Sequence, residues 1–124
     1  MNPSFVFRSG ALITATGISF GAFGSHGLRA LKPPMPETKI NSWNIASNYL
    51  IYNGLALLAI SFHPGLLGAS RKYRLGAGLI MAGAAVFSGS IFGLVAARDK
   101  FRWLGPITPL GGVSMIAGYI ILAL

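Results

Sequence analysis

A chain of 124 residues has room for one domain, and here 53% of the residues are hydrophobic and only 10% are charged, with a mean hydropathy of +0.65. Typical globular domains carry about 25% charged residues, so a soluble protein of this composition would expose too much apolar surface. Ten Lys and Arg residues against two Asp and Glu give a net charge of +8, and the absence of cysteine excludes disulfides, thiol catalysis and Cys-ligated metal sites.

Four apolar segments follow one another along the chain, at about residues 9–28, 42–67, 75–97 and 104–124, and none contains Lys, Arg, Asp or Glu. About 20 apolar residues rise roughly 30 Å as a helix, which matches the hydrocarbon core of a bilayer. Lipid offers no partner for open backbone groups, so the segments are expected to be helical. The sequence predicts an all-α, polytopic membrane protein: a single domain, 1–124, formed by a bundle of about four transmembrane helices.

The flanks of the segments support these boundaries. Arg8 before the first segment resembles the start of a secretory signal, and a signal anchor that stays as the first helix is the simpler interpretation. His63, Pro64 and Gly65 lie near the end of the second segment, where they are expected to end or kink its helix. Thr108 followed by Pro109 resembles a helix N-cap with proline at the first helical position, which would shorten the fourth helix to about 16 residues.

The basic residues gather at the ends of these segments instead of on one face. They are Arg29, Lys32 and Lys39, then Arg71, Lys72 and Arg74, then Arg98, Lys100 and Arg102. This placement is typical of loops that contact anionic lipid headgroups, and it argues against the continuous basic face of a nucleic-acid-binding protein. We expect membrane lipids as partners, together with other membrane-protein subunits or further copies of the chain, and no nucleic acid.

Small residues recur at helical spacing in two segments. Gly17 and Gly21 share a face of the first helix, and Ala85, Gly89, Gly93 and Ala97 recur every four residues in the third. Small residues let helix backbones approach closely in a membrane. These positions are predicted to be helix-packing sites, either within the bundle or at an interface with another chain.

A few polar side chains lie inside the apolar segments. His26, near the end of the first helix, is either a proton carrier or ligand, or an interfacial histidine bonded to a nearby backbone group. Together with Tyr52, Asn53, Ser88 and Thr108 it forms the candidate buried polar cluster. For His63, beside Pro64 at a helix end, a structural role is expected. Trp43, Tyr73 and Trp103 fall near segment ends and are expected to anchor at the headgroups.

No combination of residues points to catalysis. The acidic residues Glu37 and Asp99 both fall in connecting segments, so a metal site shared with the two histidines is not expected. Ser88 lies inside an apolar helix and not on the strand-to-helix turn of a hydrolase. We therefore expect no enzyme activity and no catalytic, cofactor-binding or metal-binding residues, and no cofactor.

Several motifs resemble the transmembrane protein 256 family of small membrane proteins. They are residues 21–28 (GAFGSHGL), Trp43 to Asn53 with residues 55–58 (LALL), residues 87–90 (FSGS) and residues 104–112 (LGPITPLGG). The resemblance covers nearly the whole chain and implies a four-helix membrane fold of uncharacterised function, with bacterial and mitochondrial members. It would place recurring positions at His26, Trp43, Tyr52, Ser88, Thr108 and Pro109, whereas Asn53 departs from a histidine found in many members.

Two functional hypotheses follow. The first is a non-catalytic accessory or structural subunit, or an assembly factor, of an inner-membrane complex, with a mitochondrial location; small size, packing stripes and basic loops motivate it. The alternative is a small homo-oligomeric transporter or channel with a polar path near His26 and Asn53.

Overall fold

The computed structural model describes residues 2–33, 35–68 and 71–124, and within them the chain forms four long helices joined by short helical turns. The long helices are α1 (Pro3–Phe23), α2 (Glu37–Ser61), α3 (Arg71–Phe101) and α4 (Ile107–Ala123). The short turns are η1 (Gly24–Leu28), a π-helical turn that continues α1, and the 3₁₀ turns η2 (Pro64–Leu66) and η3 (Arg102–Leu104). The expected all-α architecture with four helices is confirmed.

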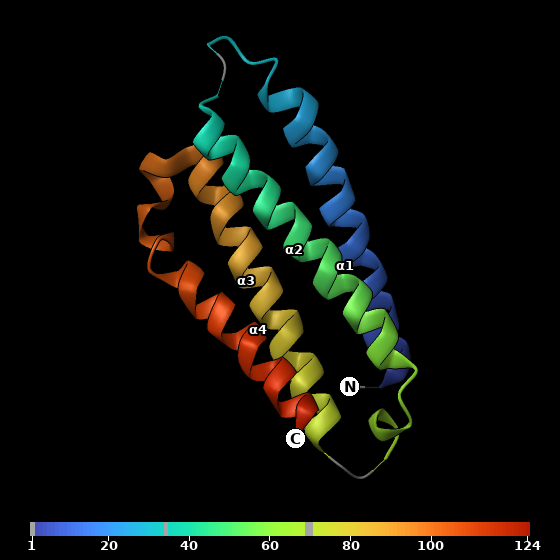
Figure 1. Cartoon of the computed structure of the whole chain (residues 1–124). Coiled ribbons are helices and arrows are strands. Elements are labelled where there is room, and N and C mark those ends of the chain that lie inside the picture. The colour runs from blue at the N-terminus through green and yellow to red at the C-terminus, as the bar shows by residue number, and fades with distance from the viewer. Residues whose placement is uncertain (1, 34, 69–70) are drawn as a thin grey trace.

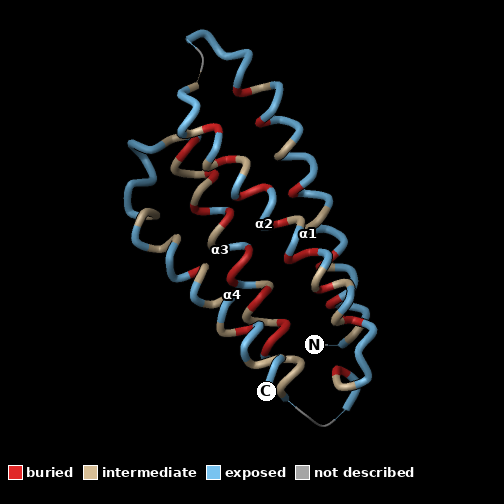
Figure 2. Tube along the Cα trace, viewed as in Figure 1, coloured by how far each residue is buried: buried red, intermediate tan, exposed pale blue. Residues whose placement is uncertain are grey.

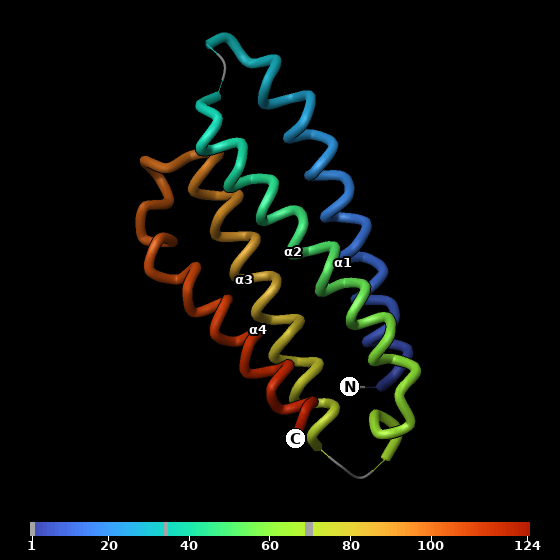
Figure 3. Tube along the Cα trace, viewed as in Figure 1, coloured from blue at the N-terminus to red at the C-terminus, as the bar shows by residue number. Residues whose placement is uncertain are grey.

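The helices lie side by side in chain order, as Figure 1 shows. The extensive contacts are those between α1 and α2, between α2 and α3 and between α3 and α4, so α1 and α4 occupy opposite edges of an open row. Successive helices run in opposite directions, and both ends of the chain therefore lie at the same end of the molecule (Figure 3). Residues 29–33 and 102–106 lie toward the other end.

The helix boundaries differ from those expected at the polar ends. α1 begins at Pro3, capped by the side chain of Asn2, instead of near residue 9, because Arg8 is accommodated on its exposed side. α2 begins at Glu37 and ends at Ser61, several residues before Pro64 and well short of residue 67. α3 extends from Arg71 to Phe101, but its backbone leaves helical geometry at Ala97 (φ −153°, ψ 64°), where the apolar run also ends.

The start of α4 was predicted wrongly in detail. The helix has 17 residues and begins at Ile107, with no side-chain hydrogen bond at its cap. Thr108 lies inside the first turn, and its hydroxyl donates back to the carbonyl of Leu104 (3.3 Å) instead of capping the helix. The short length expected for this helix is nevertheless close to the observed one.

Glycine pairs hold the neighbouring helices close together. A Cβ atom on Gly10 would lie 2.7 Å from the carbonyl oxygen of Gly54, and one on Gly54 would lie 2.8 Å from that of Gly10. Gly83 and Gly111 are related in the same way, at 2.7 and 2.9 Å. Each pair brings two backbones into contact, so α1–α2 and α3–α4 form two tightly packed helical hairpins.

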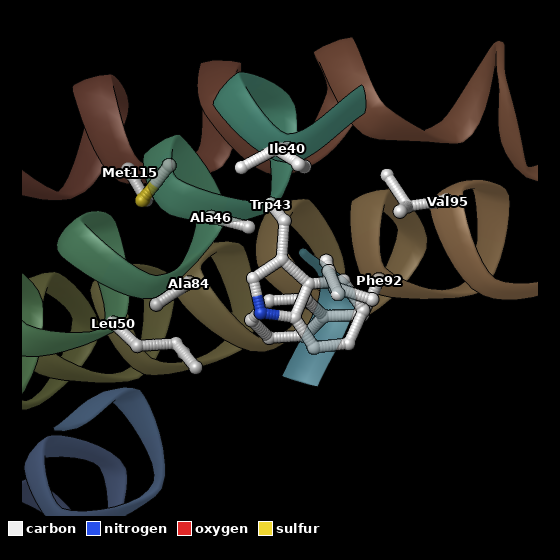
Figure 4. Packing of buried hydrophobic residues seen from close by; sticks show 9 residues of the cluster. Ile40, Trp43, Ala46, Leu50, Ala84, Phe92, Val95 and Met115 are labelled. Atoms are coloured by element: carbon white, nitrogen blue, oxygen red, sulfur yellow. The ribbon is translucent and has the colours of Figure 1, made fainter. Parts of the chain in front are cut away.

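The core lies along the contact between these hairpins. Figure 4 shows the indole ring of Trp43 against the ring of Phe92, and their centroids are 4.6 Å apart. Around them gather buried side chains from α2, α3 and α4: Ile40, Ala46, Leu50, Ala84, Val95 and Met115. A second cluster at the opposite end contains Val6, Leu57, Leu66, Ala77 and Ile80.

The outward faces of the helices are apolar. Large hydrophobic side chains are exposed on every long helix, including Leu12 (68%), Leu55 (51%), Leu75 (53%) and Leu110 (65%). Figure 2 shows the buried positions confined to the sides where helices meet. The accessible surface of 7164 Å² exceeds the roughly 6300 Å² expected of a compact soluble chain of this mass. An apolar solvent around the row explains both observations.

Candidate functional site

The most elaborate polar contact within the helices centres on Asn53. Its side chain is 3% exposed, and its amide nitrogen donates to the carbonyl oxygen of Tyr49 (2.6 Å) and to the sulfur of Met115 (3.2 Å). Its oxygen accepts a hydrogen bond from the hydroxyl of Tyr119 (2.6 Å). Asn53 therefore ties α2 to α4 across the face of α3, and its hydrogen-bonding groups are occupied.

Two serines of α3 make further hydrogen bonds between helices. The hydroxyl of Ser88, which is fully buried, donates to the carbonyl oxygen of Ala46 in α2 (2.7 Å). Ser90 shares a hydrogen bond with the hydroxyl of Thr108 in α4 (2.5 Å), and either oxygen can be the donor. Inside a membrane these hydroxyls have no water to bond, so the bonds to other helices satisfy them. The role of both serines is therefore structural.

The structure does not bring the five members of the predicted polar cluster together. Asn53, Ser88 and Thr108 are satisfied at three separate contacts. Tyr52 is 59% exposed and lies beside the ring of Tyr49. His26 is exposed in η1, and its side chain forms no hydrogen bond with a described residue. No contact among the described residues joins His26 to Asn53, so the proposed transport path has no structural support.

Sequence reasoning missed Tyr119, Met115 and Ser90 as members of these contacts. Tyr119 was the detectable one, because a hydroxyl inside a helix of high hydropathy must find a partner. The thioether of Met115 gives no such signal.

His63 has the structural role expected of it. Its Nδ1 atom accepts a hydrogen bond from the backbone N–H of Gly65 (2.9 Å), which caps η2. Its ring stacks on that of Tyr73, with centroids 4.2 Å apart. The histidine thus shapes the turn between α2 and η2.

Trp43 was predicted wrongly as a headgroup anchor. It is 6% exposed, and its indole N–H donates to the carbonyl oxygen of Phe20 in α1 (2.7 Å). A side chain on Gly24 would collide with this indole ring, which explains the glycine in the motif at residues 21–28. Trp103, by contrast, is 61% exposed near an end of the row, where an anchoring aromatic belongs.

The predicted packing residues divide into two groups. Gly17 and Gly21 face Ser47 in α2, and a Cβ on Gly17 would lie 2.8 Å from its carbonyl oxygen, so both positions serve the α1–α2 contact. The stripe on α3 does not form one interface. Ala85 and Gly89 are exposed, and nothing lies within 4 Å of a Cβ placed on Gly89, whereas Gly93 and Ala97 lie near the turn that leads to α4.

Two open grooves flank α3. One, of about 470 Å³, lies between α1 and α3 and is lined by Leu12, Thr16, Leu50, Ala85, Gly89 and Phe92, among others. The other, of about 500 Å³, lies between α2 and α4 and includes Lys39, Ile45, Phe87, Ile91, Arg98 and Thr108. At 100° per residue, the two sets of α3 positions lie on opposite sides of that helix. The features available for function are therefore these open grooves, and not a closed polar chamber.

Chemistry at a metal ion finds no support in the described residues. No three side chains of the His, Asp and Glu types come close enough together there to hold an ion. The carboxylate of Glu37 is instead engaged by Arg29, at 2.5 Å.

Comparison with known proteins places the chain in a family. Residues 20–112 match the family model described as "Protein of unknown function (DUF423)". The chain belongs to the DUF423 family. This stretch runs from the end of α1 into α4, so the DUF423 region includes Trp43, Asn53 and the lining of the α2–α4 groove.

Relatives of this DUF423 protein are described as UPF0382 membrane proteins. One from Schizosaccharomyces pombe is 36% identical over 117 residues, covering 92% of this chain and 94% of the relative. One from Staphylococcus aureus is 40% identical, covering 91% and 87%, and one from Bacillus subtilis, YwdK, is 31% identical, covering 91% and 88%. No solved structure matches the chain.

These relatives confirm a membrane protein of an uncharacterised family with bacterial and fungal members. α1 and α3 extend through stretches long and apolar enough to cross a membrane, at residues 3–28 and 71–104, and α4 is a shorter apolar helix. The name transmembrane protein 256, which the motifs suggested, is not among the matches described here.

Proposed function

We propose that this DUF423 protein is a non-catalytic membrane protein that acts as an accessory or structural subunit, or as an assembly factor, of a larger inner-membrane complex. The observation that carries the proposal is the exposed part of the small-residue stripe on α3. Ala85 and Gly89 are exposed and line the groove beside α1, and a Cβ on Gly89 would meet no described residue within 4 Å. A helix of a partner protein can approach α3 closely there, because Gly89 has no side chain that would hold the two backbones apart.

The open row supports the same proposal. α1 and α4 do not close on each other, and α1 reaches α3 only over a short stretch, where Phe20 lies against Phe92. A partner helix seated between α1 and α3 would bury exposed apolar side chains such as Leu12 and Phe20. The buried side chains of Ser88 and Asn53 already have partners within the chain, which leaves helix association as the main task of the surface.

We further propose an inner membrane as the location, and the mitochondrial inner membrane where the host cell is eukaryotic. The relative from Schizosaccharomyces pombe supports a eukaryotic branch. Staphylococcus and Bacillus have no mitochondria, so a mitochondrial location would be a property of that branch only. Fractionation of the host's membranes tests the location directly.

A matched pair of leucine substitutions tests the subunit role. Gly89→Leu fills the α1–α3 groove, whereas Val113→Leu changes a 61% exposed position on α4 that lines neither groove. On native gels of mildly solubilised membranes, the wild-type chain and Val113→Leu should migrate within a complex well above the 13.0 kDa of the chain. Gly89→Leu should release the chain from that complex.

The control for folding is the amount of each variant retained in washed membranes, which should be equal. A lone species of chain size in several mild detergents would overturn the proposal. Equal complexes for Gly89→Leu and Val113→Leu would show that this groove is not the contact.

A further inference from the structure

The second groove, between α2 and α4, has a different chemical character. We call it the α2–α4 groove, and its defining residues are Lys39, Ser42 and Ile45 of α2, Phe87 and Ile91 of α3, and Arg98 near the end of α3. Its volume of about 500 Å³ lies within the range of sites for small ligands. It opens on the side of α3 opposite to Ala85 and Gly89, so it is separate from the proposed partner contact.

Two cations stand at one end of this groove. Lys39 lies in the first turn of α2, and Arg98 lies just past the break in α3, so both are at the level where the helices end. Both also line an adjoining cavity of about 430 Å³ that Lys100 borders. Neither Lys39 nor Arg98 forms an ion pair with a described residue. Asp99 borders the adjoining cavity without such a bond, and Glu37 is engaged by Arg29.

The rest of the groove is apolar and has a defined length. Ile45, Phe87 and Ile91 line it. The ring of Phe87 lies against that of Tyr49, with centroids 5.1 Å apart, and both rings line the next cavity between α2 and α4. From Ala96, the last residue before the break, to Phe87, α3 rises by about 14 Å. This is close to half of the roughly 30 Å hydrocarbon thickness, which is one leaflet of a bilayer.

From this arrangement we infer that the α2–α4 groove binds one phospholipid with an anionic headgroup. Its phosphate lies between Lys39 and Arg98, and one acyl chain lies along Ile45, Phe87 and Ile91. Two cations at one end of a mainly apolar groove match the headgroup and the acyl chain of a lipid. Basic pockets at the ends of transmembrane helices recognise anionic headgroups in this way.

Lipid retention by the purified full-length chain tests this inference. The chain is purified in mild detergent with phosphatidylglycerol or phosphatidylcholine added, and bound lipid is counted by native mass spectrometry. We expect one phosphatidylglycerol per chain under conditions that strip phosphatidylcholine. Lys39→Gln combined with Arg98→Gln should lower its retention about thirtyfold, as expected from the loss of two headgroup contacts.

A variant of equal charge provides the control. Arg8→Gln combined with Arg71→Gln removes two exposed positive charges at the other end of the row and should retain the lipid as the wild type does. Equal losses in both double variants, or equal retention of phosphatidylcholine, would overturn the inference, because either result indicates a non-specific shell of lipid.

The hydrocarbon part is tested with a phosphatidylglycerol that carries a photoreactive acyl chain. Its adducts should map to α2, α3 and α4 around Ile45 and Ile91, and Ile91→Trp should abolish them while Val113→Trp leaves them unchanged. Adducts spread over the outer faces of α1 and α4, or dimers in place of lipid adducts, would overturn the inference. Because only the purified chain is used, the result does not depend on whether a partner complex exists.

Discussion

Individual glycines of this chain have very different costs of replacement, although the sequence gives no sign of it. A Cβ on Gly111 would lie 2.5 Å from the backbone nitrogen of Phe87 and 2.9 Å from the carbonyl oxygen of Gly83. A Cβ on Gly89 would meet nothing within 4 Å. Gly111 is therefore required by the contact between α3 and α4, whereas Gly89 is free to change within the isolated chain.

This difference predicts opposite effects of two equivalent substitutions. Gly111→Ala should lower the free energy of unfolding by about 2 kcal/mol, because backbone atoms cannot move aside without separating the helices. Gly89→Ala should leave it unchanged or raise it by up to about 1 kcal/mol, since alanine favours helix. Unfolding of the purified protein in mixed micelles, followed by circular dichroism, measures both. A loss of stability in Gly89→Ala that matches Gly111→Ala would contradict the packing described.

The polar side chains show which contacts can be predicted from residue types alone. That Asn53, Ser88 and Thr108 would be satisfied by other helices follows from the cost of an unpaired group in lipid. Which partner each one takes depends on helix rotation and register, which are set by many weak packing contacts. His26 and Tyr52 were grouped with them by type, yet they point away from the helix contacts.

Among the helices, α2 is unusual for a membrane protein. Unlike α1 and α3, it does not form a stretch apolar enough to count as a membrane span on its own, because it carries four asparagines: Asn41, Asn44, Asn48 and Asn53. It lies between α1 and α3 in the row, and it contributes nine buried residues, as many as the longer α3, among them Trp43 and Leu57. The helices on either side, α1 and α3, therefore provide α2 with packing contacts that lipid would not provide.

Membrane insertion of isolated segments should reveal this dependence. Residues 71–101 placed alone in a host protein should insert efficiently, whereas residues 37–61 alone should insert poorly, because asparagine is costly at the centre of a span. Residues 3–61 should insert as a hairpin, since α1 packs along α2. Glycosylation of acceptor sites on either side of each segment reports insertion. Equal insertion of 37–61 and 71–101 would contradict this account of α2.

At this scale the sequence predicted the number of helices and their approximate centres, because uncharged apolar runs of membrane length are unambiguous. It did not predict the early start of α2, since four of the five residues 37–41 are polar and only the preceding Pro36 marks the beginning of the helix. The break at Ala97 was also missed, because no proline or glycine stands at that position.

For the whole molecule, the open row determines the topology in the membrane. Successive antiparallel helices put both chain ends on one side and residues 29–33 and 102–106 on the other (Figure 3). The net charge of +8 is divided between these two ends, since Arg8, Arg71, Lys72 and Arg74 lie at the end with the termini.

Single cysteines test this topology, and the natural chain has none to interfere. Leu31→Cys and Trp103→Cys should react with a membrane-impermeant thiol reagent from the same side, because both residues are exposed at one end of the row. Leu67→Cys and Leu124→Cys, at the opposite end, should react from the other side only. Labelling of Leu31→Cys and Leu124→Cys from one side would contradict the four-span arrangement.

The two glycine-paired hairpins have a mechanical consequence for the molecule. Packing within each hairpin brings backbones into contact, whereas the α2–α3 contact that joins the hairpins is less extensive and rests mainly on side chains such as Trp43 and Phe92. Each hairpin therefore moves as a rigid unit. The two grooves lie on opposite sides of α3, so a rotation about the α2–α3 contact that widens one of them narrows the other. We therefore expect that a molecule bound in the α1–α3 groove changes the width of the α2–α4 groove, and the reverse.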